Sequence, residues 1–298
     1  MKRHSNNSIS PVSNVILNIV FILGALMCIV PVLLVVGISF SDERDILQYG
    51  YQLIPKRFTL YAYEFIFKWA NMLVNSYVIT VVVTIIGAAF STFTIALYAY
   101  PISRKDFSLR KLFSFLAIFT MLFNGGVIPW YIVNVRFLHI ENTLFALILP
   151  YLMNAFYVMI MCTFYRTSIP DAVLESARID GSGEFRTFFT IVLPLAVPGI
   201  ATIALFSTIQ YWNDYFLPLY LISESRMYNL QYMMYKTLEN IRVLQTINNP
   251  TARDIALKLP GESARMAMCI LSIGPVVFAY PFFQKYFIKG LTIGAVKG

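Results

Sequence analysis

Apolar residues along this chain are gathered into long runs, separated by shorter polar segments. Six runs are long enough to be membrane helices: roughly 15–38, 72–100, 112–133, 143–165, 190–221 and 266–288. Each reaches or exceeds the roughly 20 residues that a helix needs to cross the hydrocarbon core of a bilayer. The pattern predicts an all-α integral membrane protein with six transmembrane helices, and an even number of spans places both termini on the same side.

The polar segment 168–194 is patterned as two short helices rather than as a simple connection. Ser168 and Asp171 form an S-x-x-D capping pattern, and Pro170 falls in the first turn, where its missing N–H costs little. Gly181 then offers a backbone position that tolerates positive φ, which predicts the end of the first helix. The segment predicts a folded helix pair between two spans.

The second predicted helix in this segment has one apolar face. Its apolar residues recur at i, i+3, i+4 and i+7, which is helical spacing; they are Phe185, Phe188, Phe189 and Val192. A stripe of this kind is suited to lying along a membrane surface.

Composition supports the membrane assignment and excludes some functions. The chain is 58% hydrophobic and 13% charged, against about 45–50% and about 25% in soluble domains. Its net charge of +8 comes from residues dispersed at span ends, without the basic–aromatic stripe of a nucleic-acid-binding surface. No G-x-x-x-x-G-K-[ST] sequence occurs, so ATP is not bound here by a P-loop.

The spacing of several residues within 168–194 resembles a known signature. Glu175-Ser176-Ala177 is followed after three residues by Gly181, and after nine more by Ile191-x-Leu193-Pro194. This resembles the EAA motif of the permease subunits of bacterial binding-protein-dependent ABC importers. Ser176 replaces the Ala that directly follows Glu in the motif, a change from one small residue to another.

Two further runs extend the resemblance over most of residues 71–298. Residues 211–218 (YWNDYFLP) resemble the W-N-D-F-L-x-P run of carbohydrate-importer permeases. Residues 123–131 (FNGGVIPWY) resemble the branch of that family associated with oligo- and polysaccharide uptake. The resemblance implies the type I importer fold, with six transmembrane helices and a cytoplasmic coupling-helix loop.

The resemblance also implies a function and partners. The chain would be a permease subunit that translocates a carbohydrate, not an enzyme, and would carry no cofactor because ATP is bound by another subunit. Its partners would be a homologous permease subunit in a heterodimer, two copies of a cytoplasmic ATPase and an extracytoplasmic solute-binding protein. The residues expected to couple to the ATPase are Glu175, Ser176, Ala177, Arg178, Asp180, Gly181, Leu193 and Pro194.

Polar residues within the apolar runs are candidates for the substrate path. An ionisable or amide group inside a membrane usually faces a cavity or a partner, and aromatic rings can stack on sugar faces. The candidates are Asn124, Asn154, Tyr211, Trp212, Asn213 and Asp214. Residues 211–214 are equally compatible with an aromatic belt at the membrane interface, in which Asp214 has a structural role.

The distribution of basic residues favours cytoplasmic termini in a bacterial cytoplasmic membrane. The short connection 101–111 carries four Lys or Arg residues, whereas the short connection 134–142 carries one, and short basic loops stay inside. The predicted parts are a cytoplasmic tail (1–14), a first span with an outer loop (15–70), an importer transmembrane domain (71–288) and a cytoplasmic tail (289–298).

The remaining features indicate helix packing, and two rival functions each require a feature of their own. Gly87 and Ser91 form a small-xxx-small pair typical of close helix packing, and the three cysteines lack metal-site spacing. In the outer segment 222–264, four residues suggest a helix against the membrane: Met227, Leu230, Met233 and Met234. A stand-alone secondary transporter would show inverted repeats with matching helix breaks, and none is evident. A membrane enzyme would need convergent acid, base or metal groups, and only scattered candidates occur.

Overall fold

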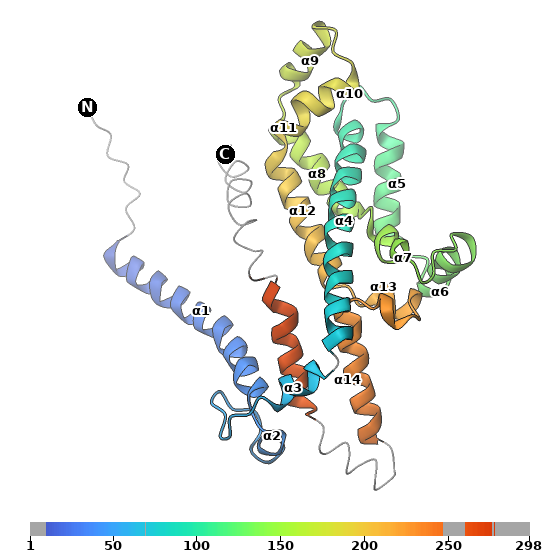
Figure 1. The fold of residues 1–298 in the computed structure, drawn as a ribbon. Coiled ribbons are helices and arrows are strands. Elements are labelled where there is room, and N and C mark those ends of the chain that lie inside the picture. Colours follow the sequence, from blue (N-terminus) through green and yellow to red (C-terminus); the bar gives the residue numbers. More distant parts are fainter. Residues whose placement is uncertain (1–9, 69, 247–259, 276, 278–298) are drawn as a thin grey trace. The chain divides into compact units, whose positions relative to one another are not determined.

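The computed structural model describes residues 10–68, 70–246, 260–275 and 277. The secondary-structure elements within these residues are all helices (Figure 1). Among these residues β-pairing is limited to one isolated bridge between Ser41 and Phe58. The chain divides into two compact units, which are described separately. One comprises the described residues up to 68 and those within 238–273, and the other comprises residues 70–237 with those after 273.

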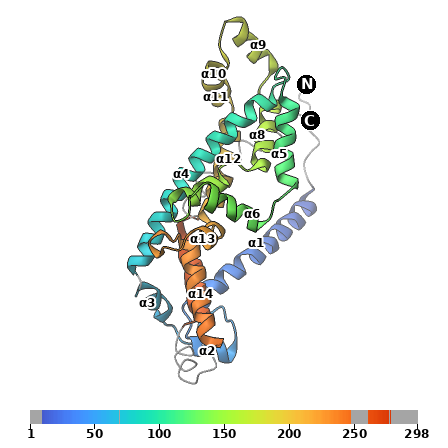
Figure 2. The same ribbon diagram turned by 90° about the vertical axis from the view of Figure 1, so that its right-hand side faces the viewer.

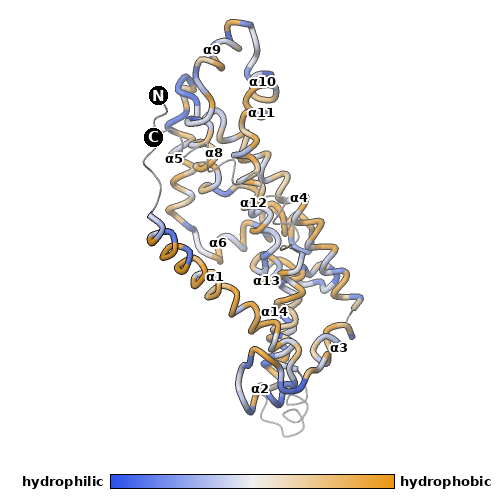
Figure 3. Tube along the Cα trace, turned by 90° about the vertical axis from the view of Figure 1, so that its left-hand side faces the viewer, coloured by the Kyte–Doolittle hydropathy of each residue, from blue (hydrophilic) through white to orange (hydrophobic). Residues whose placement is uncertain are grey.

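The first unit begins with α1 (Pro11–Ser39), a helix that is apolar along almost its whole length (Figure 3). Ser10 caps it by accepting a hydrogen bond from the Ser13 N–H. Its 18-residue apolar window has a mean hydropathy of 3.2 and no buried side chain. An uncharged helix of 29 residues exposed in this way suits a lipid environment, and the predicted first span is confirmed as a helix.

Short helices α2 (Glu43–Tyr49) and α3 (Tyr61–Phe67) follow α1. The Glu43 carboxylate accepts hydrogen bonds of 2.9 and 3.0 Å from the N–H groups of Glu262 and Ser263, where a helix over 262–275 begins. A carboxylate at this end satisfies free N–H groups and complements the helix dipole. The predicted sixth span, 266–288, lies largely outside the described residues.

The second unit is organised around α4 (Ala70–Ser103), a helix of 34 residues that covers the predicted second span. It packs along α12 (Val197–Trp212) and α8 (Ala155–Ser168). The Ser91 and Ser207 hydroxyls lie 3.3 Å apart across the α4–α12 contact. The prediction that the Gly87 and Ser91 pair marks close helix packing is confirmed.

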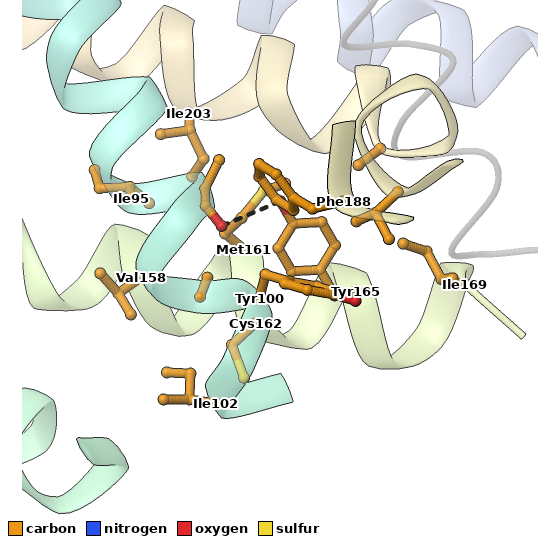
Figure 4. Packing of buried hydrophobic residues seen from close by; sticks show 14 residues of the cluster. Ile95, Tyr100, Ile102, Val158, Met161, Cys162, Tyr165, Ile169, Phe188 and Ile203 are labelled. Carbon is orange, nitrogen blue, oxygen red and sulfur yellow. Dashed lines mark hydrogen bonds between the residues drawn. The ribbon is translucent and has the colours of Figure 1, made fainter. Parts of the chain in front are cut away.

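The core of this unit lies between α4, α8 and the segment that leads into α12 (Figure 4). All its members are at most 8% exposed. They are Ile95, Ala96, Ala99, Tyr100 and Ile102 from α4; Val158, Met161, Cys162, Tyr165 and Ile169 from α8 and its end; and Phe188, Val192, Ala196 and Ile203.

Three predicted spans are bent rather than continuous. In 112–133, α5 (Arg110–Leu122) stops at a break where Gly126 has φ +84°, and α6 (Val127–Ile132) with η1 (Val133–Phe137) turns away by 115°. A left-handed backbone at glycine cannot continue a helix. The predicted third span is therefore a broken helix, interrupted at Gly126.

The other two bends lie near prolines. Helix α7 (Leu144–Ile148) and η2 (Leu149–Tyr151) meet α8 at 51°. Helices α10 (Glu184–Thr187), η3 (Phe188–Val192) and α11 (Leu193–Leu195) meet α12 at 81°. Proline lacks the N–H that an unbroken helix requires. Within the described part of the chain, two helices are long enough to span alone, and up to five spans result if each bent pair is one.

Residues 213–221 also depart from a single fifth span, because α12 ends at Trp212 and α13 (Phe216–Leu221) forms separately. Beyond η4 (Ser225–Met227), helix α14 (Leu230–Thr246) begins with a hydrogen bond from the Leu230 N–H to Thr80 Oγ1 at 2.8 Å. Leu230, Met233 and Met234 are at most 7% exposed. They pack within the protein, so the prediction that they face the membrane is wrong.

Candidate functional site

The segment predicted to couple to an ATPase lies at one end of the second unit. Helix α9 (Asp171–Ile179) projects there, next to α10 and beside the C-terminal end of α4 and the start of α5 (Figures 1 and 2). Helices α6 and α13 lie toward the opposite end of this unit. Helix α9 is therefore a short polar helix at the end of the longer helices of this unit.

The start of α9 differs from the predicted capping pattern. Ser168 is the last residue of α8, and Pro170 is the N-cap residue, with φ −66° and ψ 135° and no side-chain cap. Proline disfavours the helical conformation in the residue before it, so the chain is extended at Ile169 and Ser168 belongs to the preceding helix. The expectation that Ser168 caps α9 is wrong, although Asp171 lies in the first turn as predicted.

The end of α9 is a glycine-dependent turn, as predicted. Gly181 has φ +74°, its N–H donates to the Arg178 carbonyl at 3.0 Å, and the Ser182 N–H donates to the Ala177 carbonyl at 2.9 Å. These two bonds form a Schellman motif, which places glycine at the left-handed position. The local sequence therefore fixes the direction in which the chain leaves α9.

The predicted coupling residues occupy different surroundings. Ala177 is buried, at 5% exposure, and Leu193 is half-buried. The Ser176 hydroxyl donates to the Ala172 carbonyl of its own helix at 2.9 Å. Exposed members of the set are Glu175, Ser176, Arg178, Asp180, Gly181 and Pro194.

The apolar stripe predicted for the second helix is divided between core and surface. Phe188 and Val192 are buried in the core, at 2% and 0% exposure, whereas Phe185 is 79% and Phe189 47% exposed. The segment Phe188–Val192 is a π-helical turn, whose wider winding changes the direction of the following side chains. The expected single stripe along a membrane surface is therefore wrong.

Four charged side chains, termed here the charge network, join α9 and α10 to the chain that follows α4. Arg104 donates to both oxygens of Asp106, from Nε at 2.9 Å and from Nη2 at 2.7 Å. Arg178 of α9 also donates to Asp106. Glu184 of α10 lies 3.5 Å from Arg104 and 3.6 Å from Arg178.

A tyrosine of the core anchors this network. Tyr100 Oη donates to Glu184 at 3.1 Å and accepts from Arg104 Nη1 at 2.9 Å. The side chain of Arg104 is only 11% exposed, so its interactions are less screened than those of a surface pair. The hydrogen bonds from Arg104 and then Arg178 hold the pKa of Asp106 well below its usual range, although partial burial opposes this.

A second ion pair lies nearer the start of α9. Lys105 Nζ is 2.7 Å from Asp171, and the two side chains are 79% and 63% exposed. Positions 171 and 178 are two turns apart, on the same face of α9. Consecutive residues of the α4–α5 connection, Lys105 and Asp106, thus contact opposite charges at the two ends of this helix.

Two cavities flank the charge network. A polar one of about 640 Å³ lies between the α4–α5 connection, the end of α8 and α9, and its lining includes Lys105, Arg110, Arg166 and Glu175. A more apolar one of about 490 Å³ is lined by Leu97, Phe107, Phe185 and Phe188 among others. Glu175 is thereby placed at the edge of a recess rather than on a flat surface.

Sequence reasoning missed Tyr100, Arg104, Asp106 and Glu184. The basic residues of 101–111 served only to orient the chain, and Asp106 and Glu184 belong to none of the motifs recognised. The available signal was the charged run Arg104-Lys105-Asp106, in which an acidic residue follows two basic ones. Its partners lie 72 and 66 residues away in the sequence.

The candidates for the substrate path lie at three places in the second unit. Residues 211–214 are at the end of α12, whereas Asn124 and Asn154 lie at helix breaks: Asn124 accepts from the Gly126 N–H, and Asn154 caps α8, accepting from the Phe156 N–H, both at 2.9 Å.

At the end of α12, burial separates the four candidates. Tyr211 is 1% exposed and donates to the Ile148 carbonyl at 2.8 Å. Trp212 is 7% and Asp214 6% exposed. Asp214 accepts from the Tyr151 hydroxyl at 3.0 Å. Asn213 is exposed, and its amide donates to a carbonyl of its own helix at 3.0 Å.

Comparison with known proteins adds independent information. Residues 93–293 match the family described as binding-protein-dependent transport system inner membrane component. The chain is 37% identical to the polygalacturonan/rhamnogalacturonan transport system permease protein YtcP of Bacillus subtilis, over 92% of this chain and 94% of that protein. It is 36% identical to Protein LplC of Bacillus subtilis, over 94% of each chain.

A solved structure is similar over nearly the whole chain. It belongs to a bacterial ABC transporter involved in the import of the acidic polysaccharide alginate, with a TM-score of 0.76 and 27% identity, and it covers 96% of this chain and 100% of that one. The resemblance stated from the sequence is confirmed. The chain belongs to the family of inner membrane components of binding-protein-dependent transport systems, the permeases of ABC importers.

Proposed function

We propose that this chain is a permease subunit of an ATP-driven importer that carries an oligo- or polysaccharide across the bacterial cytoplasmic membrane. The similarity to a polygalacturonan/rhamnogalacturonan permease and to part of an alginate importer supports a carbohydrate substrate. In this proposal the substrate passes between this subunit and a homologous permease, and both termini are cytoplasmic.

The observation that carries the proposal is the exposed helix α9 with its glycine turn. Glu175 is exposed on α9, Ala177 packs inward at 5% exposure, and Gly181 fixes the exit from the helix with φ +74°. A short helix held at both ends can transmit a push as a rigid body, whereas an open loop would yield. In this proposal α9 is the coupling helix that contacts the cytoplasmic ATPase.

ATP hydrolysis would do its work through this helix. Closure of an ATPase dimer would displace α9, and the displacement would reach α8 and α12, which the segment joins. The coupling is a shift between two conformations, inward-facing and outward-facing, that binding of ATP favours differently. ATP itself is bound by the partner subunit.

Cross-linking and uptake together test this proposal. Glu175→Cys in a cysteine-free background should cross-link to the co-expressed ATPase subunit, whereas Asn240→Cys should not. The complete importer in proteoliposomes should accumulate oligosaccharides cut from polygalacturonan, arabinan or alginate only when ATP is inside. Absence of any cross-link from Glu175→Cys would refute the coupling assignment, and ATP-independent uptake would favour a secondary transporter.

A further inference from the structure

The charge network gives α9 an attachment that the chain connectivity does not supply. In sequence, α9 follows α8 and precedes α10 to α12. Helix α4 ends at Ser103, and Arg104 and Asp106 come directly after it. Through Asp106, Arg178 is therefore joined to a helix that lies more than 70 residues away in sequence.

The two ion pairs on this face of α9 differ in whether a third residue holds the partner of α9 in place. Arg104, whose side chain is 11% exposed, makes a two-pronged contact that holds the Asp106 carboxylate in place. Arg178 of α9 contacts this fixed carboxylate, and the two side chains are 61% and 41% exposed. Two-pronged guanidinium–carboxylate contacts are among the stronger polar interactions. The Lys105–Asp171 pair is largely exposed, and such pairs contribute little to stability. The attachment therefore depends on Asp106 rather than on Lys105.

The network continues into the packed core. Tyr100, which bonds to Arg104 and Glu184, is 8% exposed. Its ring lies 5.2 Å from that of Phe188 and 6.2 Å from that of Tyr165. A displacement of Arg178 is thus resisted by close-packed side chains, which do not deform continuously.

We infer that Asp106 is a positioning residue that, through Arg178, fixes the coupling helix to α4, so that α4 and α9 move as one body during transport. Helix α4 packs against both α8 and α12. A push on α9 would therefore reach three long helices of this unit together rather than only the two to which it is covalently joined. The inference rests on the proposed function of α9.

Pulsed electron paramagnetic resonance tests this directly in the complete importer. Spin labels on Ala89→Cys of α4 and Ala172→Cys of α9, both exposed positions outside the set expected to contact the ATPase, report the distance between the two helices in a cysteine-free background. In the parent protein, which keeps Asp106, the distance should be the same in the nucleotide-free complex and in the complex trapped with ATP and vanadate. Asp106→Asn should produce a nucleotide-dependent shift or broadening.

Two matched variants separate positioning from general damage. Asp171→Asn breaks only the exposed pair and should leave the distance as in the parent. Arg178→Gln removes the other partner while Arg104 still holds Asp106, and it should shift or broaden the distance as Asp106→Asn does. Assembly with the ATPase, measured by co-purification, should be unchanged in Asp106→Asn and Asp171→Asn, neither of which alters a residue expected to contact the ATPase.

The outcomes distinguish this inference from the proposed function. A nucleotide-dependent distance in the parent, or an unchanged distance in Asp106→Asn, would show that the network does not join α4 and α9, even where Glu175→Cys still cross-links to the ATPase. Failure of that cross-link would instead remove the proposed function on which the inference rests.

Discussion

The ring of Tyr211 occupies the space that a side chain at Gly87 would fill. A Cβ atom at Gly87 would lie 2.7 Å from the Cε1 and Cζ atoms of this ring, well inside van der Waals contact. The Tyr211 hydroxyl is in turn fixed to the Ile148 carbonyl at 2.8 Å. One residue of α12 therefore sets how closely α4 approaches and also where the end of α7 lies.

Gly87→Ala should destabilise the subunit because the buried Tyr211 ring would have to move. Overpacking of this kind costs about 1–3 kcal/mol, and it should appear as a lower midpoint of thermal aggregation in detergent. Gly24→Ala is the matched control, since nothing lies within 4 Å of a Cβ at that position. Equal midpoints for the two variants would show that the contact between α4 and α12 can relax.

Gly181→Val should impair coupling while the subunit still inserts. The φ of +74° at Gly181 is strained for a β-branched residue, although the space around it is open; the strain costs about 1–3 kcal/mol. We expect less uptake per ATP hydrolysed in proteoliposomes. Gly183→Val, where φ is −71° and the space is also open, should behave as the wild type. Normal uptake by Gly181→Val would mean that the turn is not needed for coupling.

The contribution of Asp106 to stability should not change between about pH 5 and pH 8. Its pKa is lowered in the folded protein, chiefly by the hydrogen bond from Arg104. Stability from a lowered carboxyl pKa is fully present above the unfolded pKa of about 3.9 and is lost only as the pH falls through the folded value. The difference in thermal midpoint between wild type and Asp106→Asn should thus be constant over this range. A difference that shrinks toward pH 5 would contradict the lowered pKa.

Alanine substitutions at Trp212 and Asn213 should distinguish a substrate-binding role of this segment from a structural one. Trp212 is 7% exposed, so Trp212→Ala should leave a cavity that costs about 3–5 kcal/mol and should reduce the amount of subunit in the membrane. Asn213 is exposed; if it lines the path, Asn213→Ala should lower uptake normalised to subunit level. An unchanged normalised uptake for Asn213→Ala would remove it from the substrate path.

Cysteine labelling in intact cells should establish the orientation. Gly183 and Asn240 are both exposed. In a cysteine-free background, a membrane-impermeant thiol reagent should label Asn240→Cys from outside and Gly183→Cys only after the cells are opened. Labelling of Gly183→Cys in intact cells would overturn the cytoplasmic placement of α9.

The sequence alone determined the features that depend on neighbouring residues. Uncharged apolar runs predicted the long helices α1 and α4, because a hydrophobic stretch of sufficient length is a span whatever surrounds it. Gly181 predicted the turn after α9, since tolerance of positive φ is a property of the residue itself. Spaced motifs likewise carried the family resemblance that the comparisons confirm.

Tertiary structure decided what depends on residues far apart in the chain. Proline and glycine marked the breaks in the apolar runs, but the bends of 51°, 81° and 115° depend on what each half packs against. The burial of Leu230, Met233 and Met234 likewise follows from neighbours outside α14. Asp106 is the clearest example of an interaction that the sequence alone does not predict. Its charge is visible in the sequence, whereas its partner Arg178 lies 72 residues away and is brought to it only when α4 and α8 pack together.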